Sequence, residues 1–323
     1  MGLLQARQPR NVLVRAMKVL VVARCKKGRY APFITEQVKA VERQGIQCQF
    51  FGIDKKGISG YFSHLKSFRR VIRDYRPDVI HAHYGFSGLF ANSQRRIPVV
   101  TTYHGSDINN PKLRFISRFS MCLSAWNIFV SRKTLEIAGP KKHFSLLPCG
   151  IDLSESQKTL KSHAREQMGL KREKKYVLFA GSFGDLVKNA PLAKETVSLL
   201  GDNVELLELK GYSREEVTLL MCAADAFLMT SFSEGSPQVI KEALACGCPI
   251  VSVDVGDVRE RVSGVAGCFV AETYAPEELA GLLRRAIAFE DKTPGLERVV
   301  SDGLDNVQIA GRLSEIYTSV TKK

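Results

Sequence analysis

Short apolar runs separated by helical segments recur along almost the whole chain, and this alternation restricts the fold more than any other feature. KVLVVAR (18–24) is short and rich in valine, which is typical of a buried strand in a parallel sheet. The segment 33–44 that follows has helical spacing and ends at Gly45, a common helix C-terminus. Parallel strands joined by helices form an open α/β sheet. Such sheets bind ligands at the C-terminal ends of their strands.

The alternation runs through two series, which predicts two Rossmann-like doubly wound domains facing each other across a cleft. Further strands of the first series are expected at 48–53, 79–83, 99–105, 127–131 and 145–152, with a helix over 60–76. Strands of the second series are expected at 176–182, 204–209, 226–231, 249–256 and 267–270, with helices over 237–246, 276–289 and 305–320.

Domain limits follow from these two series. We expect a first domain over 17–152, a polar linker with a short helix over 153–175, and a second domain over 176–303. The last segment, 304–323, is expected to cross back to the first domain. Residues 1–16 precede MKVLVVARC, which resembles a natural strand-first start, so we expect them either to form a flexible extension or to precede the true start of the protein.

The composition is that of a soluble globular protein, with 45% hydrophobic and 25% charged residues among 323. No apolar run approaches the ~20 residues needed to cross a bilayer. Residues 1–16 lack the apolar core and cleavage site of a secretory signal. We therefore expect a cytoplasmic protein, located in solution or at the inner face of the membrane.

Eight cysteines occur without any C-x-x-C spacing, mostly within apolar segments. This pattern favours reduced thiols that act as small hydrophobic side chains over a disulfide framework or a zinc site. We expect neither a metal nor a cofactor. The cysteines are Cys25, Cys48, Cys122, Cys149, Cys222, Cys246, Cys248 and Cys268.

Charge is unevenly distributed between the two halves. Residues 1–152 contain 26 Lys and Arg against 8 Asp and Glu, a net charge of +18. Residues 153–323 contain 21 against 25, a net charge of −4, so the whole chain carries +14. A basic half of this kind predicts an anionic partner.

SFSEGSPQVIKEALACG (231–247) places two glutamates, Glu234 and Glu242, around the start of a helix that follows an apolar strand. Ser236 is suited to cap this helix, Pro237 suits its first turn, and Gly235 allows a close backbone approach. A helix N-terminus attracts phosphate. At ~1.5 Å per helical residue the glutamates span roughly a dozen ångströms, which matches the two ends of a nucleotide-sugar.

The stretch AADAFLMTSFSEGSPQVIKEALACGCPIVSVDVG (223–256) resembles the donor-site signature of the retaining GT-B glycosyltransferases of family 4. The likeness extends more weakly from Met17 to the last helix. It implies that Glu234 contacts the donor sugar and Glu242 binds the ribose of the nucleotide. It also implies that backbone groups of Gly235, Ser236, Pro237 (by position only) and Gln238 approach the sugar and phosphates.

The same resemblance implies an arginine and a lysine that hold the diphosphate, after the first strand of the second domain. In AGSFGDLVKNAP (180–191), Lys188 is well placed as this lysine, whereas Ser182 stands where the arginine is expected. Either another cation compensates for the missing charge, or phosphate binding is weaker than in the family.

TTYHGSD (101–107) follows an apolar strand, so His104 is expected at a strand end that faces the cleft. A histidine bonded to the backbone of the Gly105 turn is the structural alternative. The resemblance implies that His104 reaches the donor sugar near its leaving phosphate. Asp107 is expected to anchor this loop or to contact the acceptor, and His83 to line the acceptor side.

GYFSHLKSFRRVIRDYRP (60–77) predicts a helix with an apolar stripe and a basic face. One interpretation is a surface helix whose charges are simply solvated. The alternative is a face that rests on anionic lipid headgroups, as in some members of the family. The basic residues are Lys66, Arg69, Arg70 and Arg73.

Together these features predict a retaining transferase of cell-surface polysaccharide synthesis that moves a sugar from an NDP-sugar to a glycan or lipid-linked acceptor. A nucleotide-sugar epimerase of the same architecture is a second hypothesis. A nucleic-acid-binding protein is a third, weaker hypothesis, because no nucleic-acid motif accompanies the charge and the excess stays in one half. We therefore expect no nucleic-acid partner.

Overall fold

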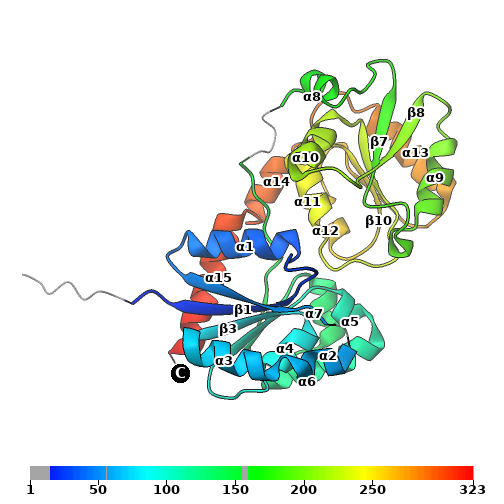
Figure 1. Ribbon diagram of the computed structural model, residues 1–323. Coiled ribbons are helices and arrows are strands. Elements are labelled where there is room, and N and C mark those ends of the chain that lie inside the picture. The colour runs from blue at the N-terminus through cyan, green and yellow to red at the C-terminus, as the bar shows by residue number, and fades with distance from the viewer. Residues whose placement is uncertain (1–14, 56, 155–158, 323) are drawn as a thin grey trace, which may run out of the picture.

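Six parallel strands form the sheet of the first half in the computed structural model, which describes residues 15–55, 57–154 and 159–322. The first fourteen residues of the predicted extension lie outside the described residues. The strands are β1 (Lys18–Arg24), β2 (Gln47–Ile53), β3 (Val79–His83), β4 (Val99–Tyr103), β5 (Trp126–Phe129) and β6 (Phe144–Leu146). Their order in the sheet is β2-β1-β3-β4-β5-β6 (Figure 1).

Helices cover both faces of this sheet. They are α1 (Pro32–Glu42), α2 (Gly57–Ser63), α3 (Leu65–Tyr75), α4 (Gly85–Ala91), α5 (Ser106–Asn109), α6 (Pro111–Leu123) and α7 (Arg132–Ala138). Side chains alternate between the faces, as the period of two in a strand requires. Val19 and Val21 of β1 pack in the cluster that includes α1, whereas Leu20 and Val22 pack in the cluster that includes α3 and α4.

Five parallel strands form the second sheet, in the order β11-β10-β9-β7-β8. They are β7 (Lys175–Phe179), β8 (Val204–Glu208), β9 (Ala226–Met229), β10 (Ile250–Val253) and β11 (Phe269–Ala271). The surrounding helices are α8 (Lys161–Gln167), the 3₁₀ turn η1 (Leu186–Lys188), α9 (Ala190–Ser198), α10 (Arg214–Ala223), α11 (Gln238–Ala245), α12 (Val258–Val262), α13 (Pro276–Ile287) and α14 (Gly295–Ser301). The predicted α/β fold class is therefore confirmed.

The last helix, α15 (Asn306–Thr321), lies against the first half of the chain, where Figure 1 shows it in red among the blue elements. Ile309, Leu313 and Tyr317 are buried in the same apolar cluster as Val19 and Ile34 of β1 and α1. The chain therefore leaves the first half after β6, along residues 147–154 (the first crossing), and returns to it at 304–306. Ile151 and Asp305 form a parallel bridge where these two crossings meet.

The predicted helix over 60–76 is wrong as a single element, because it is interrupted at His64. The ring Nδ1 of His64 lies 2.7 Å from the carbonyl oxygen of Gly60. That carbonyl would accept the His64 N–H in a continuous helix, but here the N–H donates to Tyr61 instead. The predicted strand over 145–152 is also shorter than expected, since β6 ends at Leu146 and the rest forms the first crossing.

Candidate active site

Two loops at strand ends, one from each half, meet at the centre of the molecule. The loop after β4 places Gly105 against Gly235 of the loop after β9. A β-carbon on Gly105, whose φ is +106°, would lie 2.5 Å from the Cα of Gly235, and one on Gly235 would overlap the carbonyl oxygen of His104. Asn109 Nδ2 also donates to the carbonyl oxygen of Glu234 at 3.0 Å. The backbones of the two halves are thus in direct contact beside His104 and Glu234.

Glu234 and Lys188 form an ion pair at this meeting point, with 2.6 Å between Oε1 and Nζ. Both side chains are largely shielded from solvent. Lys188 is the last residue of η1, and its carbonyl oxygen accepts a hydrogen bond from the Thr230 hydroxyl. The structure therefore brings together the two residues that the sequence analysis assigned to the donor sugar and the diphosphate.

The start of α11 differs from the prediction. Pro237, not Ser236, is the N-cap residue, and it has no side-chain cap bond. The predicted cap is wrong because the Ser236 hydroxyl donates to Asp257 Oδ2 at 2.8 Å. Among the described residues, no acceptor is recorded for the N–H groups of Ser236 and Gln238. These donors and the positive end of the helix dipole are suited to an anion.

Two side chains of α11, the partly buried Gln238 and the fully buried Lys241, bind the first crossing between the halves. Gln238 Nε2 donates to the carbonyl oxygen of Gly150 at 2.8 Å, and Lys241 Nζ donates to that of Cys149 at 2.8 Å. Lys241 also donates to Gln238 Oε1 at 2.7 Å. Burial lowers the pKa of Lys241, which is fully enclosed. Both polar atoms of the Gln238 side chain are thus hydrogen-bonded within the protein, and its backbone N–H remains available to a bound ligand.

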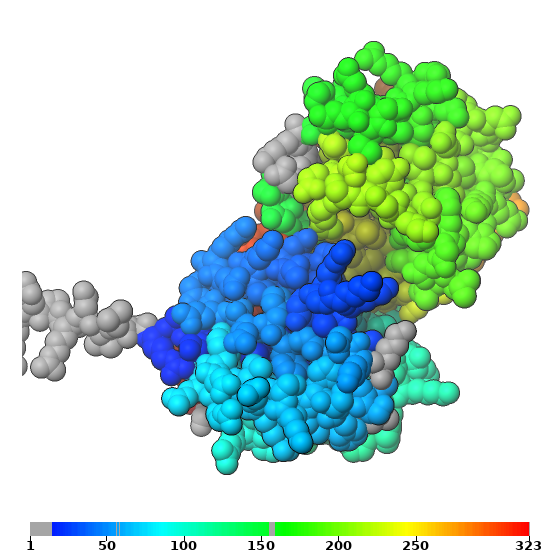
Figure 2. Space-filling model, viewed as in Figure 1, coloured from blue at the N-terminus to red at the C-terminus, as the bar shows by residue number. Residues whose placement is uncertain are grey.

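Glu242 lies at the edge of a cavity of about 310 Å³ between α1, α10 and α11. Arg214 Nη2 is 2.8 Å from Glu242 Oε1 and 3.2 Å from Glu36 Oε1, so one guanidinium bridges carboxylates from both halves. Figure 2 shows the two halves with a hollow between them. The cavity reaches Asp152 on the first crossing.

The sequence analysis missed Arg214, Glu36 and Lys241. Arg214 and Lys241 are cations of the second half, placed close to Glu242. Ser182, which stands where the arginine of the family is expected, is partly buried and its hydroxyl accepts from the Gly184 N–H at 3.3 Å. Lys241 could have been noticed from its spacing of three residues from Gln238, since both lie on one face of the helix.

His104 is held from both sides of its ring. Its Nε2 lies 3.0 Å from His83 Nδ1, and its Nδ1 lies 3.8 Å from the sulfur of Cys149. The Tyr84 ring packs 4.6 Å from it. Burial lowers the pKa of His104 to about 3, so its imidazole is neutral near pH 7. A neutral ring adds no charge to the site.

His83 and Asp107 support this loop from within the protein. His83 is fully buried behind His104, so it does not line an acceptor surface directly, and burial lowers its pKa well below the usual value. Asp107 accepts the N–H groups of Gly85, His104 and Gly105, which makes it the anchor of the loop. Burial raises the pKa of Asp107 to about 6 despite these bonds.

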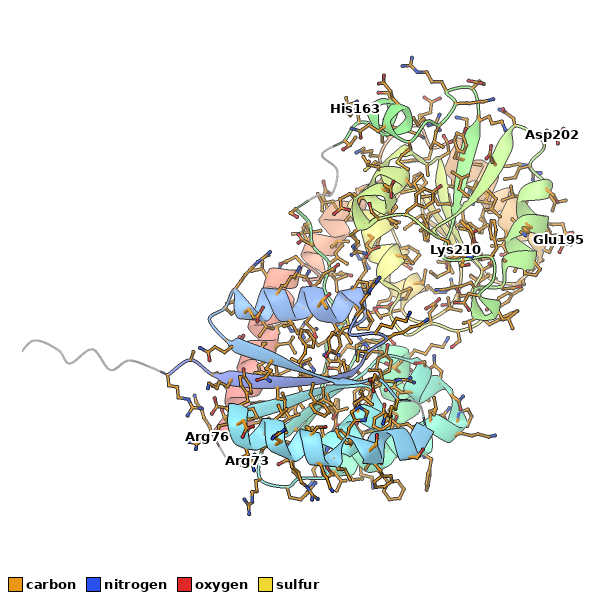
Figure 3. The ribbon with its side chains drawn as sticks, viewed as in Figure 1. Arg73, Arg76, His163, Glu195, Asp202 and Lys210 are labelled. Carbon is orange, nitrogen blue, oxygen red and sulfur yellow. The ribbon has the colours of Figure 1, made fainter. Side chains whose placement is uncertain are left out.

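The four basic residues of the predicted anion-binding face, Lys66, Arg69, Arg70 and Arg73, are exposed on α3. Arg73 projects outward from the end of this helix (Figure 3) and is 3.1 Å from Asp74. Within residues 15–55, 57–154 and 159–322, no group of three or more His, Cys, Asp or Glu side chains is placed to hold a metal ion. In the same part of the chain, no helix combines the length and apolar character needed to cross a membrane.

Comparison with known proteins agrees with this geometry. The profile of Glycosyltransferase Family 4 matches residues 13–155, and that of Glycosyl transferases group 1 matches residues 154–288. The two profiles together span most of the chain, which belongs to the GT-B glycosyltransferases of the family 4 type. The protein is a glycosyltransferase.

Individual relatives are distant. TuaC of Bacillus subtilis (strain 168), named as a teichuronic acid biosynthesis glycosyltransferase, is 28% identical over 297 residues, covering 80% of this chain and 74% of TuaC. Sucrose-phosphate synthase from Thermosynechococcus elongatus superposes with a TM-score of 0.80 at 17% identity, covering 95% of this chain and all of the other. Anabaena HepE in complex with UDP superposes with a TM-score of 0.74 at 18% identity, covering 94% and 100%. These structures confirm the fold.

Replacement of Glu242 by alanine tests the nucleotide end of the site. Loss of a charged acceptor for the ribose hydroxyls should weaken binding of the preferred nucleoside diphosphate by about 1.5–3 kcal/mol. Isothermal titration calorimetry with a panel of nucleoside diphosphates measures this change. Glu215→Ala, at an exposed glutamate that lines the same cavity, is the matched control. Equal affinities of the two variants would place ribose recognition elsewhere.

Acid should destabilise the fold through its neutral histidines. Burial lowers the pKa of His81 to about 3, because its ring is enclosed between Tyr317 and Thr102. A group with a folded pKa below its unfolded value of about 6.5 stabilises the fold above that pH, and the stability is lost as the pH falls. Each such histidine should remove about 1.4 kcal/mol of unfolding free energy per pH unit below 6.5.

Urea unfolding of His81→Gln and wild type between pH 7 and pH 5 measures the contribution of His81. The variant should lose less stability over this range than wild type. The raised pKa of Asp107 acts in the opposite sense below about pH 6, but it is common to both proteins. His163→Gln, at an exposed histidine on α8 (Figure 3), is the control and should follow wild type. Identical pH slopes in all three proteins would contradict a neutral, buried His81.

Proposed function

We propose that the protein transfers a sugar from a nucleoside-diphosphate sugar to a glycan or lipid-linked acceptor in cell-surface polysaccharide synthesis, with retention at the anomeric carbon. The observation that carries this proposal is the Lys188–Glu234 pair, set beside the free N–H groups of α11 and against the His104 loop. A cation, a helix N-terminus and a carboxylate in this order suit a diphosphate followed by a sugar. HepE, a structural neighbour, is described in complex with UDP and with UDP-glucose.

The donor would lie along α11. Glu242 would accept hydrogen bonds from the ribose hydroxyls, which requires Arg214 to move or to share the carboxylate. The diphosphate would lie against Lys188 and the N–H groups of Ser236 and Gln238, so that the site needs no metal to balance its charge. Glu234 would then exchange part of its contact with Lys188 for a hydroxyl of the sugar.

Transfer would proceed on the face of the sugar from which the diphosphate leaves. The bond between the anomeric carbon and the phosphate oxygen breaks, and a bond forms from the acceptor hydroxyl oxygen to the same carbon. The proton of that hydroxyl passes to the phosphate oxygen of the nucleoside diphosphate, which is the leaving group. His104, neutral and fixed by His83 and Cys149, would orient the sugar without competing for this proton.

Glu234→Gln tests the sugar end of the site. It should lower turnover at least tenfold while changing nucleotide affinity much less, because the lost charge would lie at the sugar and not at the ribose. Product formation with an acceptor and calorimetry with the nucleotide separate the two effects. Glu272→Gln, at an exposed carboxylate of the second half, is the control. A larger loss of nucleotide affinity than of turnover would reverse the roles of Glu234 and Glu242.

The same measurements separate this proposal from its alternative. An epimerase would consume the nucleotide-sugar and release its isomer in the absence of any acceptor. The proposed transferase would show only slow hydrolysis under those conditions. Proton NMR of the glycosidic linkage formed with an acceptor reports retention or inversion directly.

The basic residues of α3 are proposed to hold the protein at an anionic membrane. Each Lys or Arg near such a surface contributes about 1 kcal/mol, screened beyond roughly 10 Å at moderate salt. Simultaneous replacement of Lys66, Arg69, Arg70 and Arg73 by glutamine should therefore strongly reduce sedimentation with anionic vesicles. Wild type should be released by salt and should ignore zwitterionic vesicles.

A matched variant controls for the loss of four charges as such. It replaces four exposed basic residues of the second half by glutamine: Lys171, Arg172, Lys194 and Lys210. This control should still sediment with anionic vesicles. Equal sedimentation of the two quadruple variants would leave α3 as a solvated face.

A further inference from the structure

An apolar groove opens on the face of the first half that carries α2, α4 and α6. Its volume is about 390 Å³, and nearly all of its lining is hydrocarbon. Of its two polar residues, Asn92 donates to the Gly88 carbonyl and to Ser124. The groove is lined by Tyr61, Phe62, Phe86, Leu89, Ile116 and Leu123, among others. Nothing in the proposed donor site uses this surface.

Large apolar side chains stand exposed at the groove and along α6, which contributes to its lining. Phe62 is 65% exposed, and along α6 Phe115 is 65%, Phe119 is 53% and Leu123 is 37% exposed. The three α6 residues are four positions apart, so they follow one line of the helix, and the rings of Phe115 and Phe119 lie 5.0 Å apart. A continuous apolar patch of this kind on a soluble surface marks a binding site.

The groove lies next to a second cavity that reaches the loop of His104. Tyr61 and Phe86 line both the groove and a second cavity of about 380 Å³, which also reaches Tyr84 and Asp107. The Tyr84 ring in turn packs 4.6 Å from His104. An extended molecule that entered through the groove would therefore end beside the proposed site of sugar transfer.

Beyond the apolar groove, charged residues line the route. Asp107 lines the second cavity, with its carboxylate occupied by three backbone N–H groups. Arg24, which is exposed at the end of β1, lines the second cavity. Lys26 and Arg29 flank the tight turn that follows β1, where they pair through their backbones. A molecule that is hydrocarbon at one end and anionic before its reactive hydroxyl matches this order. A second copy of the chain does not, because it would bring two basic surfaces together.

We propose that the groove holds the hydrocarbon chain of a phosphate-linked lipid acceptor. The phosphate lies beside Arg24 and the acceptor hydroxyl beyond it faces His104. The exposed line of Phe115, Phe119 and Leu123 rests at the lipid surface from which the chain enters. This inference rests on the proposed sugar transfer and narrows its acceptor to a membrane lipid.

Linear alkyl phosphates below their micellar concentrations are the probe. Octyl phosphate should bind wild type with a saturable stoichiometry of one. Butyl phosphate should bind more weakly, by roughly two- to fourfold for each methylene removed while the groove still has room for the chain. Equilibrium dialysis or calorimetry measures both. Equal affinities of butyl and octyl phosphate would overturn the proposal, since the chain would then contribute nothing.

Variants of the groove give the decisive comparison. Leu89→Trp fills the groove and Phe62→Ser removes part of its wall, so each should lower octyl phosphate affinity at least tenfold and flatten its dependence on chain length. Leu199→Trp, at an exposed leucine directly after α9 in the second half, is the matched control and should bind like wild type. Thermal unfolding verifies that each variant folds. Unchanged octyl phosphate affinity in both groove variants would place the chain elsewhere and refute the inference.

The phosphate end and the donor end are tested separately. Arg24→Gln should weaken octyl phosphate at least threefold but leave octanol binding unaltered; equal losses for both ligands would overturn the phosphate assignment. Donor binding is followed independently with the nucleoside diphosphate. If the groove binds octyl phosphate but no NDP-sugar is used, the proposed function fails and the lipid site stands. If the sugar is transferred and the groove variants change nothing, only this inference fails.

Discussion

The backbone contact between Gly105 and Gly235 is the constraint on which the rest of the site depends. Each glycine leaves no room for a β-carbon on the other, so the strand ends of the two halves approach as closely as backbones can. His104 and Glu234 are the immediate neighbours of these glycines in the chain, and the contact therefore sets their separation. A side chain at either position would separate the halves and widen the gap across which the sugar must be held. Positive φ at Gly105 adds a second reason for glycine there, since it turns the loop back into α5.

Helix α11 connects the contact between Gly105 and Gly235 with the proposed nucleotide site. Its first turn carries free N–H groups, its middle binds the first crossing through Gln238 and Lys241, and Glu242 reaches Arg214 and, through it, Glu36 of the first half. The buried ammonium of Lys241 is costly to desolvate, and Gln238 Oε1 on the same helix and the Cys149 carbonyl oxygen on the first crossing compensate for that cost. The proposed donor site and the contacts that hold the two halves together thus share helix α11. Binding of a donor along α11 would therefore be coupled to the arrangement of the halves.

The fold could be predicted from the sequence because each strand is a short valine-rich run and each crossover has a helical period. Glu234, Lys188 and His104 could be placed together because all follow apolar strands, whose C-terminal ends meet at one edge of each sheet. Long-range partners could not be predicted. Nothing in the local pattern of 214–218 indicates that Arg214 bridges Glu36 and Glu242, since the contact depends on how the two domains dock. The interruption at His64 was also missed, because propensity and spacing describe a helix and do not reveal a ring that takes the Gly60 carbonyl.

The two faces of the first sheet are covered by different helices, which make different contacts. α1 and α15 cover one face. Glu36 of α1 pairs with Arg214 of the second half, and Tyr317 of α15 hydrogen-bonds to the buried His81. α2, α3, α4 and α6 cover the other face, which carries exposed phenylalanines and arginines. Within the part of the chain that the structure describes, no hydrogen bond or ion pair joins these four helices to the second half. Part of the positive charge of the first half therefore lies on a face that is turned away from the mildly acidic second half. A donor bound by the second half and an acceptor that arrives across the far face of the first would meet only at the strand ends, where His104 lies. In this proposal the sheet would separate a water-soluble donor from an acceptor that enters from a lipid surface.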